Sequence, residues 1–135
     1  MARTNLHECI HADMLRKLNS KQLLNLEEMN FKLVYEHFKD KNFNPSQTHH
    51  ETMAELYVVE MAKALEDFHK NALSSDYNDF INYYGTPPNS TFYEALAWRG
   101  LKDGDVQAWK DLTPKEKQAI DVESGKLNML TKNCN

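Results

Sequence analysis

The sequence predicts a mainly α-helical protein that forms a single compact domain of about five to six helices. Its length of 135 residues suits one domain. Hydrophobic residues make up 41% and charged residues 27%, which is the balance of an ordinary globular protein. The chain has only four Gly and four Pro, and its apolar residues recur at helical spacing. These features leave little room for a large sheet.

Two amphipathic helices are expected in the first third of the chain. The first runs from about residue 4 or 5 to residue 18 and buries residues four positions apart, namely Leu6, Ile10, Met14 and Leu18. The second runs from residue 21 to about residue 40 and stops before Pro45, since Asn and Pro residues follow it. Its apolar stripe consists of Leu23, Leu24, Phe31, Val34, Tyr35 and Phe38.

A third helix is expected to start at a capping box formed by Thr48 and Glu51, in which each side chain satisfies a free N–H of the other residue. Its apolar face runs from Met53 to Phe68 and includes Tyr57.

The last third of the chain is expected to contain two more helices. The aromatic segment 77–84 comes first and stops at Gly85 and two prolines. A helix over residues 90–98 follows and ends near Gly100, where a left-handed cap suits glycine. The final helix begins at Thr113-Pro114-Lys115-Glu116, which combines a capping box with proline at the first helical position. We expect the domain to span residues 1–123 and a frayed tail to span 124–135.

The charge balance predicts neither a nucleic acid nor a membrane as partner. The net charge is −4 and the pI is about 5.8, so no global positive field is available to attract either one. No run approaches the roughly 20 apolar residues that cross a bilayer. The N-terminus lacks the apolar region of a signal peptide, and Cys9 and Cys134 do not form a dense disulfide pattern. We therefore expect a reducing compartment, by default the cytoplasm.

The sequence His7-Glu8-Cys9-Ile10-His11 is an HExxH motif on a predicted helix. Two histidines four residues apart lie about 40° from each other around a helix axis, so both imidazoles can bind one metal ion. Zinc is the expected ion because it accepts imidazole nitrogen readily. Glu8 can take a proton from the water that the metal activates. The motif therefore predicts His7 and His11 as zinc ligands and Glu8 as general base, and the alternative is a metal-free helix with exposed histidines.

A catalytic zinc site needs a third protein ligand, and we expect His50 to supply it. His50 lies on the predicted inward face, three residues before Met53 and seven before Tyr57. A buried imidazole needs a hydrogen bond or a metal, and a zinc site on the first helix would satisfy it. His49 is the next candidate, because two adjacent histidines cannot be separated by sequence alone.

The other candidate ligands are less favoured. Carboxylate alternatives are Glu51, Glu27 and Glu28, but the capping box claims the first and the other two are typical of a solvated pair. His37 and His69 are expected at the surface near helix ends, where a cation is favourable.

The run RTNLHECIHADML resembles the active-site helix of the zincin metallopeptidases, and its HExxHA form is similar to the SprT-like and related minimal zincins. The segments HHETMAELY and FYEALAWRGL resemble parts of uncharacterised bacterial proteins in which HExxHA is followed by H-x-x-M-A and then L-A-W-G-G-L. This resemblance implies that His50 is the downstream metal ligand. It also implies a packing role for the segment around Trp98, where Arg99 stands in place of a glycine.

The resemblance implies zinc-dependent hydrolysis of a peptide or protein substrate. Tyr57 is a candidate to stabilise the oxyanion because it shares the predicted inward face with His50, and the alternative is a core tyrosine whose hydroxyl is hydrogen-bonded. Zincins have a sheet before this helix, whereas only six residues precede His7 here. We therefore expect either a minimal helical version or the C-terminal part of a longer protein. The alternatives are a helical binding or regulatory module whose zinc is structural, and a metal-free helical interaction domain.

Overall fold

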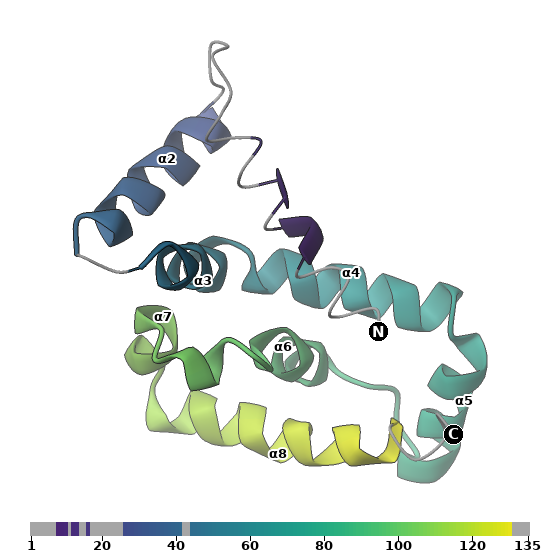
Figure 1. Cartoon of the computed structure of the whole chain (residues 1–135). Coiled ribbons are helices and arrows are strands. Elements are labelled where there is room, and N and C mark those ends of the chain that lie inside the picture. Colours follow the sequence, from purple (N-terminus) through teal and green to yellow (C-terminus); the bar gives the residue numbers. More distant parts are fainter. Residues whose placement is uncertain (1–7, 11, 14–15, 17–25, 42–43, 131–135) are drawn as a thin grey trace.

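The computed structural model describes residues 8–10, 12–13, 16, 26–41 and 44–130, and these residues form a helical protein (Figure 1). This architecture confirms the predicted mainly α class, and the described residues contain no strand. The elements are α2 (Leu26–Lys39), α3 (Pro45–Leu56), α4 (Val58–Asn71), α5 (Ser74–Tyr84), α6 (Ser90–Trp98), the 3-10 helix η1 (Lys102–Gly104), α7 (Gln107–Asp111) and α8 (Pro114–Leu130). No described helix is long and apolar enough to span a bilayer.

Helix α6 lies between α4 and α8, which pack against it from opposite sides (Figure 1). It begins as predicted, because the Asn89 side chain accepts a hydrogen bond of 2.8 Å from the Phe92 N–H. Five of its nine residues are buried, namely Phe92, Tyr93, Ala95, Ala97 and Trp98. A helix with apolar residues on so much of its circumference is stable only inside a core.

The end of α6 also matches the prediction. Helical geometry stops at Trp98, and Gly100 adopts a left-handed conformation with a φ of 96°. Leu101 follows and is completely buried. The Trp98 ring contacts the Trp109 ring edge to face, with centroids 5.2 Å apart. The segment around Trp98 thus packs in the core, and Arg99 is exposed.

The predicted third helix is in fact two helices, α3 and α4, which meet at Tyr57. Tyr57 has a φ of −119° and a ψ of −7°, which interrupts the regular helix.

The start of α3 was also predicted wrongly. Pro45 occupies the first turn, and the Asn44 side chain caps the helix through the Gln47 N–H at 2.8 Å. Proline suits the first helical position, so the helix begins before Thr48 and no capping box forms there.

The capping box at the start of α8 is confirmed. The Thr113 N–H donates to the Glu116 carboxylate at 2.8 Å, and the Glu116 N–H donates to the Thr113 hydroxyl at 3.3 Å. The helix then continues to Leu130, past the end that we expected at residue 123. Residues 131–135 of the predicted tail lie outside the described part.

The aromatic segment forms a full helix, α5, and ends at Gly85, which has a φ of 74°. At the other end of the chain, residues 8–10, 12–13 and 16 are helical, within the range predicted for the first helix. The remaining residues before Leu26 lie outside the described part of the structure. With α3 and α4 separate and α5 and α7 formed, the described residues contain more helices than the five to six predicted.

Candidate functional site

The described part of the HExxH motif is helical and has one buried side. Glu8 and Cys9 are exposed, whereas Ile10 has an exposed fraction of only 9%. Ile10 belongs to the main hydrophobic cluster, together with Met53 and Ala54 of α3. Ile10 therefore packs on the same core as α3. His7 and His11, the two predicted zinc ligands, lie outside the described residues.

His50, the predicted third ligand, is half-buried on α3. Met53 and Ala54 follow it by three and four positions, and both are buried. Residues at this spacing share one face of a helix. His50 thus lies on a face of α3 that contributes to the same hydrophobic cluster as Ile10.

His49, the second candidate, is the more buried of the two histidines. Its ring contacts Tyr35 of α2 edge to face, with centroids 5.6 Å apart. Burial lowers the pKa of His49, and the nearby charge of His50 lowers it further. The neutral imidazole is thereby favoured, and this is the form that binds a metal ion.

Glu51 has a different role from the one predicted. Glu51 has an exposed fraction of 1%, and its carboxylate accepts a hydrogen bond of 2.7 Å from the Gln107 N–H at the start of α7. It also accepts a weaker one, of 3.4 Å, from the Gln47 amide. Glu51 thus caps a helix, as expected, but a distant helix rather than its own. Glu27 and Glu28, the other carboxylate alternatives, belong to α2.

The remaining histidines differ from each other. His37 is exposed, as predicted. The surface prediction for His69 was wrong, because its exposed fraction is 6% and its Nδ1 lies 3.0 Å from the Tyr93 hydroxyl. Its Nε2 is buried and has no hydrogen-bond partner among the described residues. Burial lowers the pKa of His69, although Asp76 opposes this shift.

The spacing of apolar residues along α4 indicates that His69 is buried. Met61, Leu65 and His69 are four residues apart, so the histidine continues a buried stripe of α4. Tyr57, the candidate for stabilising the oxyanion, is half-buried and packs against the core.

Within the described residues, no three His, Cys, Asp or Glu side chains gather in a way that could hold a metal ion. The predicted site depends on His7 and His11, which are not among these residues. The chain matches no protein-family model, and it matches no curated protein and no solved structure.

Proposed function

We propose that this protein is a zinc-dependent peptidase in which His7, His11 and His50 bind the metal ion and Glu8 is the general base. The observation that carries the proposal is the position of Ile10. This residue lies inside the HExxH motif and is buried in the same cluster as Met53, one helical turn after His50. The shared cluster supports a position of the motif close to the first half of α3, where His50 lies.

The proposal requires a regular helix through residues 7–11. Such a helix would set positions 7 and 11 about 60° and 100° around the axis from Ile10, on the same side. Position 8 would lie about 160° from Ile10. The exposure of Glu8 and the burial of Ile10 agree with this arrangement. Both imidazoles would then lie at the border between the core and solvent, where a metal ion and a substrate can meet.

The side chains in and near the motif suit the chemistry. Bound zinc supplies a Lewis acid that activates water and polarises a carbonyl group. The exposed Glu8 carboxylate can accept the proton of the attacking water and can later deliver it to the leaving amine. His50 is half-buried, so its ring can reach an ion while part of it stays against the core.

The wider sequence pattern also supports the proposal. His50-Glu51-Thr52-Met53-Ala54 matches the H-x-x-M-A element that follows HExxHA in the proteins that the chain resembles. Met53 and Ala54 are buried, which gives a physical reason for these two residue types at these two positions.

Glu8→Gln tests the assignment of the base. It should leave the zinc content unchanged and reduce hydrolysis of an unstructured protein such as casein by at least about 100-fold. The matched control is Glu36→Gln, since Glu36 is an exposed residue of α2 that pairs with Lys39 on the surface. The control should keep full activity. Two results would favour a helical binding or regulatory module instead. One is a Glu8 variant that hydrolyses casein as fast as the wild type. The other is a wild-type protein that binds zinc but cleaves no peptide.

A further inference from the structure

His69 is buried where three helices meet, and the proposed hydrolysis does not use it. It belongs to the last turn of α4. Its Nδ1 lies 3.0 Å from the hydroxyl of Tyr93 on α6. Its ring contacts the ring of Tyr77 on α5 edge to face, with centroids 5.3 Å apart. One imidazole of α4 therefore touches both α5 and α6.

The surroundings of His69 suit a neutral ring better than a charged one. Both nitrogens of a protonated imidazole carry a hydrogen and need an acceptor. Tyr93 can accept from Nδ1, but Nε2 is buried and has no hydrogen-bond partner among the described residues. Burial lowers the pKa of His69, and Asp76 in the first turn of α5 opposes this shift without cancelling it. A charge on His69 therefore destabilises the packing of the three helices.

The other titratable groups around His69 leave such a charge without compensation. On α4, the Glu66 carboxylate is already paired with Lys70 at 2.6 Å. On α5 and α6, Tyr77 and Tyr93 carry no charge near neutral pH. Burial also raises the pKa of Tyr93, so its hydroxyl stays neutral.

Helix α5 is the element best placed to separate from the others. It lies at one end of the stack formed by α4, α6 and α8 (Figure 1). Its one buried residue is Phe80, whose ring packs edge to face on Phe92 of α6 with centroids 5.0 Å apart. Leu73 before the helix and Gly85 after it both have non-helical dihedral angles. A segment with so few buried contacts can open while the rest of the chain stays folded.

We propose that protonation of His69 releases α5 from α4 and α6 while these two helices stay packed. Release exposes Nε2 to water, which hydrates the charged ring. It also uncovers Phe80 and the side of Phe92 against which Phe80 packs. The proposal is independent of zinc and of hydrolysis.

Proton linkage sets the size of the effect. The open form takes up a proton at the ordinary pKa of 6.5, whereas the closed form binds it more weakly. Above pH 6.5 neither form is protonated, so the equilibrium constant for opening does not change with pH. Between pH 7.5 and pH 5 this constant should rise several-fold, and the ceiling for one proton is about 30-fold.

Hydrogen exchange of the full chain, followed by NMR in EDTA, measures this opening without a contribution from metal release. A released helix of 11 residues is marginal in water, so its amides exchange. After correction for intrinsic exchange rates, the protection factors of Phe80 and Ile81 should fall several-fold between pH 7.5 and pH 5. Those of buried α6 residues such as Ala95 should stay higher at each pH, because α6 remains packed.

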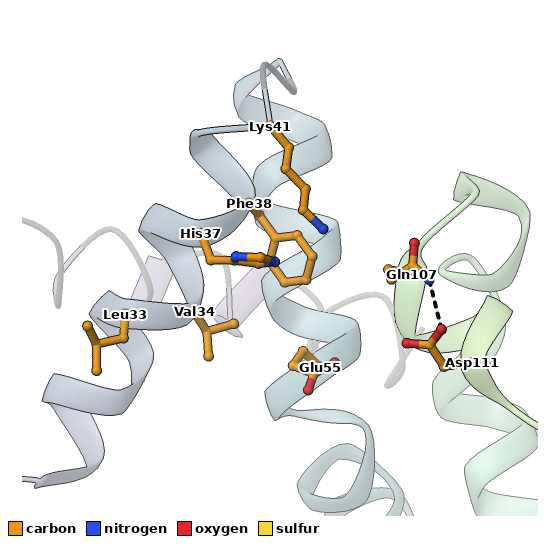
Figure 2. Close-up of a pocket in the computed structure, with 8 residues that line it drawn as sticks. All are labelled: Leu33, Val34, His37, Phe38, Lys41, Glu55, Gln107 and Asp111. Carbon is orange, nitrogen blue, oxygen red and sulfur yellow. Dashed lines mark hydrogen bonds between the residues drawn. The ribbon is translucent and has the colours of Figure 1, made fainter.

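His69→Gln should remove the pH dependence of the α5 protection factors, because glutamine does not titrate. The matched control is His37→Gln. His37 borders an open groove of about 340 Å³ between α2 and α7 (Figure 2). Its ring also contacts an aromatic neighbour, Phe38, at 5.3 Å, but it is exposed. The control should therefore keep the wild-type dependence of α5.

Asp76→Asn tests the same coupling with the His69 ring in place. Without the Asp76 charge, the protonated ring is less stable in the closed form, so α5 protection should fall more steeply below pH 6.5 than in wild type. Asp79→Asn changes an exposed acid of the same helix and should behave as wild type.

Four results would overturn the proposal. The first is α5 protection that does not change with pH, and the second is a wild-type fall that persists in the His69→Gln variant. The third is an Asp76→Asn variant whose protection falls no more steeply than that of wild type. The fourth is equal protection of α5 and α6 at each pH, which would show that the chain opens only as a whole.

Discussion

The buried carboxylate of Glu51 caps α7 through a hydrogen bond of 2.7 Å from the backbone N–H of Gln107, 56 positions further along the chain. Helix α7 has five residues and receives no cap from the side chain of Val106. The first N–H groups of a helix have no partner within it, and a carboxylate there also meets the positive end of the helix dipole. Glu51 therefore joins α3 to α7.

Replacing Glu51 should show the strength of this cap. Glu51→Ala should lower the free energy of unfolding by about 2 kcal/mol, because it leaves the Gln107 N–H without its acceptor and creates a small cavity. Glu51→Gln keeps one acceptor oxygen and should cost less than the alanine variant. Urea denaturation measures both. If Glu51→Gln and Glu51→Ala lowered the free energy of unfolding by the same amount, the carboxylate would not act as a cap.

The stability of the protein should depend on the protonation of His69. Burial lowers the pKa of His69 in the folded chain below the ordinary value of 6.5, so the unfolded chain takes up the proton first as the pH falls. The contribution to stability is complete above pH 6.5 and is lost as the pH falls from there towards the folded pKa. The slope from this residue cannot exceed about 1.4 kcal/mol per pH unit.

His69→Gln checks this dependence, because glutamine does not titrate and can still reach the Tyr93 hydroxyl. Its urea midpoint should fall less than that of wild type between pH 7.5 and pH 5. The pKa of His49 is lowered as well, so part of the slope should remain. Exposed His37 is the matched control, and His37→Gln should retain the wild-type slope. An unchanged slope in the His69 variant would contradict the argument.

Two glycines should respond to alanine in opposite directions. Gly85 ends α5 with a φ of 74° and has open space around the position of a Cβ atom, so only the backbone opposes a side chain. Gly85→Ala should cost about 1 kcal/mol. Gly125 lies inside α8, also in open space, and Gly125→Ala should stabilise by roughly 0.5 to 1 kcal/mol. Thermal melts of both variants test this contrast, and a change of the same sign in both would refute it.

The features of the fold that the sequence predicted are formed by residues only a few positions apart in the chain. Neighbouring residues form the caps and turns that predicted the bounds of α6, the left-handed Gly100 and the Thr113–Glu116 box. The break at Tyr57 was not predictable in this way. The apolar pattern continues through Tyr57 without a break. The two helices nevertheless pack against different neighbours, α3 against α2 and α7, and α4 against α5 and α6.

The sequence predicts only those residues of the candidate site that lie close together in the chain. The HExxH spacing defines His7, Glu8 and His11 without any knowledge of the fold. Glu51 was assigned to the wrong helix because its true partner, Gln107, is distant in sequence. The choice between His49 and His50 depends on how α3 faces the rest of the protein, and adjacent positions in a sequence carry no information on that.

The zinc content of the purified protein shows whether the proposed metal site exists. Protein purified without added metal and analysed by inductively coupled plasma mass spectrometry should contain about one zinc per chain, as a site with three histidine ligands predicts. His50→Ala should lose most of this zinc, whereas His49→Ala should keep it and retain a wild-type helical spectrum. Negligible zinc in the wild-type protein, or full zinc in the His50 variant, would contradict the proposed site.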